Sequence, residues 1–410
     1  MKKKIWFIVG VIVFIALIAT GVGIYLMLNS NVENQTSAKM SSFTSKFIKQ
    51  VNKYNENSNY VVSPYSVEIA LSMLKEGSNG NTEKQISNVI KEGKTGLNNK
   101  NVKLANALFI EDTYKDVVEK SFINTLRNKY KSELLVSKFE DPKLINDWVK
   151  KKTDGMIPKV LDNSSEEFVL GMANVIAINT RWKYQFDCEM TDKEKFINND
   201  DSIDVEMMHN TYDEGIKYLD GDVKGILLPY KDKYGLEFIG LMPQKDLNKF
   251  IDSLDNKNLN KYLNSFKKLK TKQKLELSLP RFSYEYDFQE FKDGLENIGI
   301  KDVFSKKKAV ITKIIKKKNQ KFKQSDNLYI SVAVHKAKIK LNEKGTKAAA
   351  VTYYGAQWDS IQKEVPKIID IKFNKPFMYI IRDKKSKEIL FFGTVYEPNK
   401  WKGNTCTAEN

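Results

Sequence analysis

One long segment between two strand-like stretches constrains the fold of this chain more than any other feature. Residues 343–365 (EKGTKAAAVTYYGAQWDSIQKEV) follow one convincing strand pattern at 330–342 and precede another at 368–373. A connection of this length is too long for a hairpin, and unstructured connections longer than about 12–15 residues usually carry function or are disordered. We therefore predict a long exposed loop that joins two strands of a sheet-rich domain.

The first part of this loop has the side-chain pattern of a latent strand. Because successive side chains of an extended chain point to opposite faces, Thr346, Ala348, Ala350 and Thr352 would share one face and Lys347 would lie on the other. Small residues on one face and a charge on the opposite face suit a segment that can slip between existing strands. The alternative interpretation is a solvated helix or flexible loop. We favour the latent strand.

The N-terminus predicts a membrane anchor. Residues 2–4 are lysines, and residues 5–28 carry no charge. A membrane-spanning helix needs about 20 apolar residues, whereas the core of a cleaved signal peptide usually has about 7–15. Lysines before the run and none directly after it favour an N-terminus inside the cell and a body outside it. We predict a cytoplasmic basic tail at 1–4, a single-pass signal-anchor in the cell membrane at 5–28 and a linker at 29–40, with cleavage and secretion as the alternative.

The rest of the chain has helical patterns first and strands later. Helices are predicted at 42–53, 65–75, 117–130 and 142–153. Apolar runs that suit buried strands lie at 101–111 and 168–181, and further strands are predicted at 225–230, 237–242, 275–281, 330–342, 368–373, 377–382 and 388–395. Helices followed by mostly antiparallel strands indicate an α+β fold.

Composition and motifs narrow the function. The formal net charge is +17, from 68 Lys and Arg against 51 Asp and Glu. The excess is spread along the chain as in a solvated surface, so we expect no nucleic-acid partner and keep anionic cell-surface polymers as an alternative partner. The two histidines, His209 and His335, and the two cysteines, Cys188 and Cys406, predict no metal site, no cofactor and at most one disulfide. No hydrolase, phosphate-loop or metalloprotease motif is present, so we predict that the chain is not an enzyme.

A family resemblance enters at the long loop. Residues 331–352 (SVAVHKAKIKLNEKGTKAAAVT) resemble the proximal hinge of the serpins, and other stretches resemble this family in its usual order: SPYSVEIALSML at 63–74, NALFIED at 106–112, INDWVKKKTDGMIPKVL at 145–161, LSLPRF at 277–282, LENIGIKDVF at 295–304, FNKPFMYIIRD at 373–383 and ILFFGTVYEP at 389–398. Each stretch alone is weak, but the ordered set is specific. It implies a bacterial-type, membrane-anchored or secreted serpin.

The resemblance implies a serpin-like domain at 41–398 and a C-terminal tail at 399–410. Its helices would pack around three mostly antiparallel sheets, and a reactive loop would be exposed. The implied activity is suicide inhibition of a serine or cysteine protease. The target cleaves the loop, is trapped as an acyl-enzyme, and the freed segment inserts as a new strand of the large sheet. We expect a monomer. The alternative is a non-inhibitory serpin-fold protein that binds surfaces through its basic field.

The resemblance also implies roles for individual residues. The hinge comprises Glu343, Gly345, Thr346, Lys347, Ala348, Ala349, Ala350, Val351 and Thr352. The polar cluster that controls sheet opening, the shutter, comprises Ser63, Ser66, Asn174 and His335. The family's usual spacing from Glu343 places the cleaved bond between Asp359 and Ser360, with cleavage after Trp358 or Lys363 as alternatives. Two departures from the family pattern are a missing glycine just before Trp182 and Lys347 in place of an acid.

Overall fold

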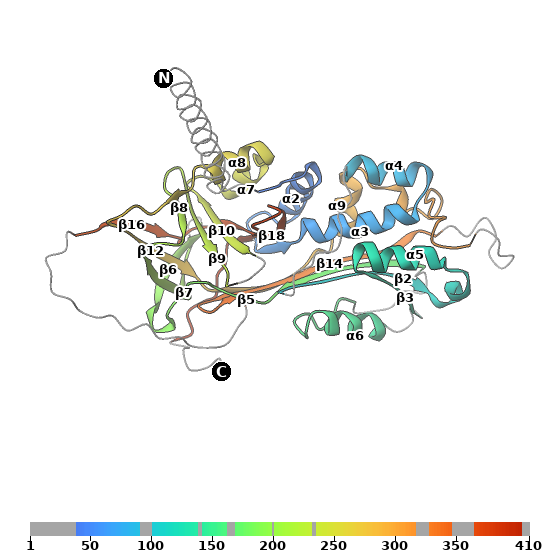
Figure 1. The fold of residues 1–410 in the computed structure, drawn as a ribbon, viewed down its shortest axis with the longest axis horizontal. Coiled ribbons are helices and arrows are strands. Elements are labelled where there is room, and N and C mark those ends of the chain that lie inside the picture. The colour runs from blue at the N-terminus through green and yellow to red at the C-terminus, as the bar shows by residue number, and fades with distance from the viewer. Residues whose placement is uncertain are drawn as a thin grey trace, which may run out of the picture.

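The structure is a computed structural model. It describes residues 38–90, 101–137, 142–161, 169–198, 201–231, 235–316, 328–346 and 365–403. The body is elongated, with most helices toward one end and the shorter strands toward the other (Figure 1). The described strands form three sheets, as expected, and most neighbouring strands run antiparallel.

The large sheet runs along the body. Its strands follow the order β3-β2-β4-β14-β15-β5, and β13 also pairs with β14. Their bounds are Glu133–Ser137 for β3, Val102–Glu111 for β2, Leu170–Ile178 for β4, Ile330–Asn342 for β14, Gly345–Thr346 for β15, Thr180–Arg181 for β5 and Phe282–Asp287 for β13. Every residue of β4 is buried. Because the sheet is covered on both faces, the residues of β4 do not alternate between apolar and polar as they would in a strand with one solvent-facing side.

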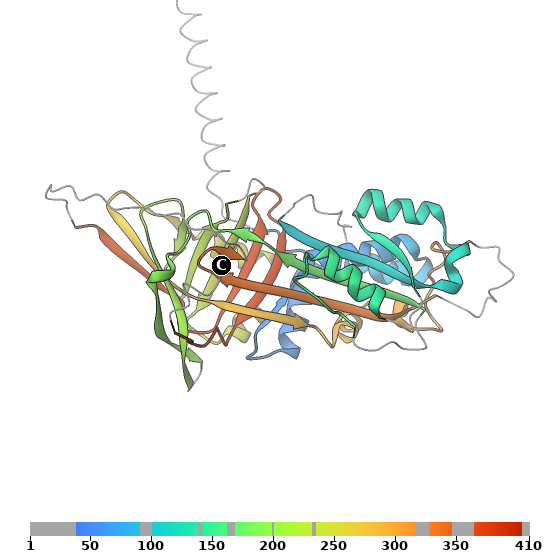
Figure 2. The same cartoon turned by 90° about the horizontal axis from the view of Figure 1, so that it is seen from below.

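Helices cover both faces of the large sheet. Figure 1 places α2 (Ser42–Tyr54), α3 (Pro64–Gly77), α4 (Gly80–Val89), α5 (Lys120–Thr125) and α9 (Phe291–Asn297) above it and α6 (Lys143–Lys152) below it. Helix α3 begins at Pro64, and the Ser63 side chain caps it by accepting a hydrogen bond from the Ser66 amide. Figure 2, seen from below, shows α6 in front of the long strands.

The other two sheets lie toward the end of the body opposite most of the helices (Figure 1). One has the order β1-β18-β17-β10-β9-β8-β11, and the other has the order β16-β12-β7-β6. The first contains β1 (Tyr60–Val62), β18 (Ile389–Val395), β17 (Phe377–Asp383), β10 (Leu236–Pro243), β9 (Val223–Pro229), β8 (Lys217–Leu219) and β11 (Lys267–Lys268). The second contains β16 (Lys367–Lys372), β12 (Gln273–Pro280), β7 (Asp201–Tyr212) and β6 (Thr191–Asn198). Helices α7 (Leu247–Asp252) and α8 (Asn256–Asn264) lie beside the first of them (Figure 1).

The structure alters two of the predicted segments, and it adds elements that the sequence analysis did not predict, among them α4, α8, β6, β7 and β13. The helix predicted at 117–130 is shorter, because Val118 pairs with Ile315 in an isolated β-bridge and the Glu119 amide donates to the Ile314 carbonyl. Only Lys120–Thr125 is α-helical, and a π-helical turn follows at Leu126–Tyr130. The strand predicted at 168–181 is broken at Asn179 into β4 and β5. In both segments tertiary pairing overrides the local pattern.

The predicted membrane anchor at 5–28 lies outside the described residues. None of the helices in the described part of the chain combines the length and the hydropathy that a membrane crossing requires.

Candidate functional site

The site begins at the seam between β4 and β14 in the middle of the large sheet. The two strands are adjacent and parallel, with Leu170–Ala177 of β4 facing Ile330–Lys338 of β14. At one end of the seam the short strand β15 lies between β14 and β5 and runs antiparallel to both. The first loop residues after β14 therefore already occupy the start of a strand position between the β4–β5 side and β14.

The two residues of β15 fit this position tightly. Gly345 has a φ of 141°, and a Cβ atom there would lie 2.4 Å from the Thr180 carbonyl oxygen and 2.5 Å from the Arg181 Cα. A side chain at Gly345 would therefore collide with the backbone of β5. Thr346 is fully buried, and its hydroxyl lies 2.9 Å from the Tyr230 hydroxyl. The hinge enters the sheet through one glycine and one small polar residue.

A buried ion pair holds Glu343, the first residue of the predicted hinge. The Glu343 carboxylate accepts hydrogen bonds from Arg281 Nε at 2.6 Å and from the Thr191 hydroxyl at 2.5 Å. Glu343 is 4% exposed. Arg281 also lies 3.5 Å from Glu206. Because breaking a buried pair leaves an uncompensated charge, these contacts fix the point from which the loop leaves β14.

An aromatic stack closes the same end of the sheet. Trp182 stacks on Tyr230 with ring centroids 4.5 Å apart and an interplanar angle of 5°. Its indole Nε1 donates to the Asn342 carbonyl at 2.9 Å, and its amide donates to the Lys344 carbonyl at 3.0 Å. Trp182 is therefore hydrogen-bonded to the residues on either side of Glu343. It makes these contacts although the residues before Trp182 depart from the family pattern.

A buried polar cluster lies on the α3 side of the seam, between the sheet and the start of this helix. The structure brings together His335 of β14, Asn174 of β4 and the serines Ser63 and Ser66 at the start of α3. His335 Nε2 accepts from the Ser63 amide at 3.2 Å, and His335 Nδ1 lies 2.5 Å from Asn174 Oδ1. Asn174 Nδ2 donates to the Ser66 hydroxyl at 2.6 Å. All four residues have 0% exposure.

The cluster has a fifth member that the sequence analysis did not single out. Asn106 of β2 pairs directly with Asn174 in the antiparallel register of β2 and β4. Its Oδ1 accepts from Asn174 Nδ2 at 2.6 Å and from the Ser66 hydroxyl at 3.2 Å. The signal in the sequence is a single asparagine in an otherwise apolar strand, because a buried amide needs hydrogen-bond partners.

These contacts define the protonation state of His335. Asn174 Oδ1 can only accept, so His335 Nδ1 carries the hydrogen, and Nε2 is free to accept from the Ser63 amide. Burial lowers the pKa of His335 from 6.5 to about 3. A neutral imidazole therefore bridges β4, β14 and the start of α3.

This environment predicts a pH dependence of stability. In the folded protein His335 stays neutral down to a pKa of about 3, whereas in the unfolded chain it takes up a proton below about pH 6.5. The unfolded state then binds more protons, so stability is lost as pH falls through this window. Between pH 7 and pH 4.5 the His335 contribution to the loss is about 2–3 kcal/mol.

Urea unfolding of the wild type and of His335→Gln at both pH values tests this expectation. Glutamine offers a donor and an acceptor but does not titrate, so the loss on acidification should be about 2–3 kcal/mol smaller in the variant. Equal losses in the two proteins would contradict the assignment.

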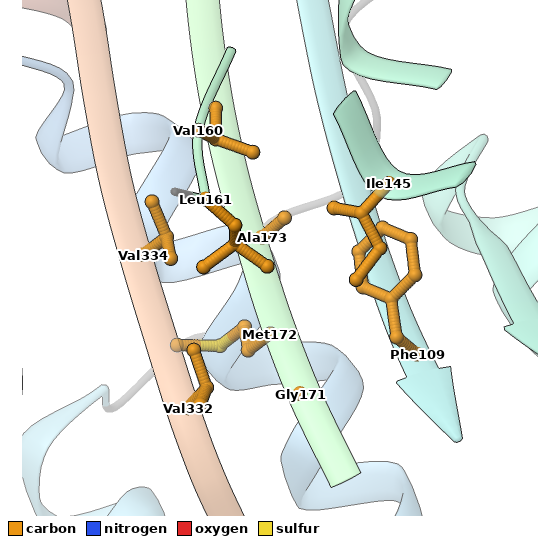
Figure 3. A pocket seen from close by; sticks show the side chains of 9 residues that line it. All are labelled: Phe109, Ile145, Val160, Leu161, Gly171, Met172, Ala173, Val332 and Val334. Carbon is orange, nitrogen blue, oxygen red and sulfur yellow. The ribbon is translucent and has the colours of Figure 1, made fainter. Parts of the chain in front are cut away.

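Helix α6 and the segment after it cover the opposite face of the seam. A small apolar hollow lies beneath them, lined by Phe109, Ile145, Val160, Leu161, Gly171, Met172, Ala173, Val332 and Val334 (Figure 3). Gly171 and Ala173 belong to β4, and Val332 and Val334 belong to β14. Lys336 Nζ of β14 donates to the Lys159 carbonyl at 2.9 Å. Parting β4 from β14 therefore also disturbs this cover.

Several predicted site residues lie outside the described part of the chain. These are the hinge residues 347–352, the predicted cleavage pair Asp359 and Ser360, and the alternatives Trp358 and Lys363. Within the described ranges, no group of three or more His, Cys, Asp or Glu could hold a metal ion. Cys188 is disulfide-bonded, and Cys406 is the only other cysteine of the sequence.

The short strand β15 after β14, together with a buried polar cluster at the β4–β14 seam, is the arrangement that the family resemblance predicts for a serpin-like fold. The comparisons agree. The family described as Serpin (serine protease inhibitor) matches residues 38–398, so the chain belongs to the serpin family. Serpins are protease inhibitors rather than enzymes.

Individual relatives cover most of the chain. The leukocyte elastase inhibitor of Sus scrofa is 30% identical over 393 residues, which are 89% of this chain and 100% of the relative. The leukocyte elastase inhibitor of Xenopus tropicalis is 28% identical over 397 residues, 90% of this chain and 100% of the relative. The native state of tengpin, a thermophilic serpin, is 25% identical with a TM-score of 0.71, covering 87% of this chain and 93% of tengpin. Thyroxine-binding globulin in complex with thyroxine, 21% identical with a TM-score of 0.73 over 88% of this chain and 98% of its own, shares the fold.

Proposed function

We propose that this serpin is a suicide-substrate inhibitor of a serine or cysteine protease. The observation that carries the proposal is the position of Gly345–Thr346 between β14 and β5, antiparallel to both. A loop that continued along this line would run between β4 and β14. It would replace their one parallel ladder with two antiparallel ladders, and antiparallel pairing is slightly more stable per residue.

The proposed reaction needs no catalytic group of the inhibitor. The nucleophile of the target protease attacks the carbonyl of Asp359, the bond to Ser360 breaks and releases Ser360 as a new N-terminus, and Asp359 stays bound to the protease as an ester or thioester. Cleavage after Trp358 or Lys363 is the alternative. Once the loop is cut, the residues from 347 onward are free to insert between β4 and β14. They carry the bound protease along before water hydrolyses the ester or thioester. The uncut form is therefore held by a kinetic barrier, to which the His335 cluster and the cover over the seam contribute.

We also propose that residues 5–28 tether the body to the outer face of the cell membrane, or act as a signal that is cleaved before secretion. The support is the uncharged run of 24 residues with lysines only on its N-terminal side. A tethered inhibitor would act on proteases at the surface of its own cell.

The test exposes the full chain, in detergent, to proteases with Asp, aromatic and Lys preferences. The products are reduced before analysis, because Cys188 is disulfide-bonded and Cys406 lies in the C-terminal fragment. We expect an SDS-resistant complex with one protease class and a C-terminal fragment that begins at Ser360. Another starting residue would move the cleavage site and keep the mechanism. Cleavage by every protease without a complex, and without a gain in thermal stability, would refute inhibition.

A further inference from the structure

The described chain begins at a point that is firmly attached to the body. The Ala38 amide donates to Asn260 Oδ1 at 2.8 Å, and the Met40 amide donates to Asn256 Oδ1 at 3.1 Å, so α8 holds this segment from one side. The Lys39 amide donates to the Lys387 carbonyl at 2.6 Å, from the turn after β17. Ala38, the exit point of the described chain, therefore lies between α8 and this turn.

Lysines from four separate parts of the chain gather around this exit. We call them the junction surface: Lys39, Lys217, Lys261, Lys268, Lys384 and Lys387, all exposed or half-buried. Lys268 of β11 faces Lys217 of β8 in the register of the two strands. Lys261 follows Asn260 on α8, and the Lys384 amide bonds to the Gly235 carbonyl beside β10.

Several lysines of the junction surface are close enough to interact electrostatically. Burial and the positive charges of Lys268, Arg382 and Lys387 lower the pKa of Lys217. Burial and the charges of Arg382 and Lys384 likewise lower the pKa of Lys387. Three nearby carboxylates are engaged locally: Glu388 lies 3.3 Å from Lys39, Glu237 lies 2.7 Å from the buried Arg382, and Asp383 accepts from the Ser386 amide and hydroxyl. A net positive field therefore faces outward at the exit.

The short stretch of chain before the exit limits the distance between the junction surface and the membrane that would hold the apolar run. Residues 29–37 separate the apolar run at 5–28 from Ala38. Even fully extended, these residues span only about 30 Å, at about 3.3–3.6 Å each. A short tether keeps the junction surface at high effective concentration near the bilayer, and a field of this sign is attracted by anionic lipids.

We propose that the junction surface docks the body on anionic phospholipid headgroups of the membrane that holds the N-terminal run; this rests on the tether proposed above. The docking fixes an orientation. In Figure 1, α8 and β8 lie along the upper long side of the body, whereas β16, the first strand after the long loop, lies at the left end. A docked body lies along the membrane and presents its loop-bearing end sideways, at a constant height above the lipid.

Lysine acetylation footprinting of the full chain in nanodiscs tests the docking. One nanodisc contains phosphatidylcholine alone, and the other contains about 30% phosphatidylglycerol, which gives a surface potential that attracts basic segments. We expect acetylation of Lys261, Lys268 and Lys384 to slow about threefold or more with the anionic lipid, and to recover in about 1 M NaCl, where the Debye length falls to about 3 Å. Exposed lysines away from the exit serve as internal controls: Lys120, Lys150 and Lys307.

Matched triple variants make the assignment specific. Converting Lys261, Lys268 and Lys384 to glutamine should remove most of the anionic-lipid protection at the remaining members, Lys39 and Lys387. Converting the three control lysines to glutamine should leave that protection unchanged. Both variants alter only exposed side chains and keep the fold.

The outcomes separate docking from tethering. A chain that does not stay with the nanodisc overturns the tether and, with it, the docking proposal. A retained chain with equal lysine reactivity in both lipids overturns the docking alone. Uniform protection of junction and control lysines overturns the assigned surface, because it indicates non-specific adsorption.

Discussion

Replacement of Thr346 by arginine is expected to abolish covalent trapping while the loop remains cleavable. Thr346 is fully buried between β14 and β5, with its hydroxyl against Tyr230. An arginine here would bring a charge into a position where Thr346 is fully buried, and burying an unpaired ion costs several kcal/mol. The hinge would therefore stay outside the sheet, and the acyl-enzyme would hydrolyse before insertion.

The measurement is the number of inhibitor molecules consumed per protease inactivated. We expect it to rise more than about tenfold for Thr346→Arg, because a barrier increase of about 1.4 kcal/mol already slows insertion tenfold. Thr346→Ser keeps the hydroxyl and the small size, so its value should stay close to that of the wild type. Normal trapping by Thr346→Arg would show that the loop does not enter at β15.

Replacement of Asn174 by alanine is expected to produce the largest loss of stability among single changes in the polar cluster. Asn174 accepts from His335 Nδ1 and donates to the Ser66 hydroxyl and to Asn106 Oδ1. Its removal takes the acceptor from the buried His335 Nδ1 hydrogen and one of the two hydrogen bonds that Asn106 Oδ1 accepts. At about 1–3 kcal/mol for each unsatisfied group, we expect a loss of about 4 kcal/mol.

Urea unfolding at pH 7 measures this loss, and Asn179→Ala is the matched control. Asn179 is the exposed residue between β4 and β5, so the same substitution there should change stability by about 0.5 kcal/mol or less. The Asn174 variant should also lose inhibitory activity faster on storage, because β4 and β14 part more easily. A loss below about 1 kcal/mol would show that the cluster tolerates an unsatisfied group, against the usual cost.

Local patterns in the sequence predicted many of the strands well. The strand at 330–342 was predicted with the bounds that β14 has, and the helix predicted at 42–53 corresponds to α2. These elements are readable because burial selects apolar residues at regular intervals and turn residues end each run. The hinge at 347–352 stays a prediction, because these residues lie outside the described part of the chain.

Local sequence patterns were therefore enough for the α+β class, the serpin family and the bounds of several long elements. The tertiary structure alone decided which distant residues meet. His335 and Asn174 are 161 residues apart in the chain, and Asn106 joins them only because β2 and β4 align the two asparagines. The junction surface likewise draws on lysines between positions 39 and 387. The physical reason is that periodicity reports how one segment faces the core, whereas a buried cluster or a charged surface depends on the register between segments, which no local pattern encodes.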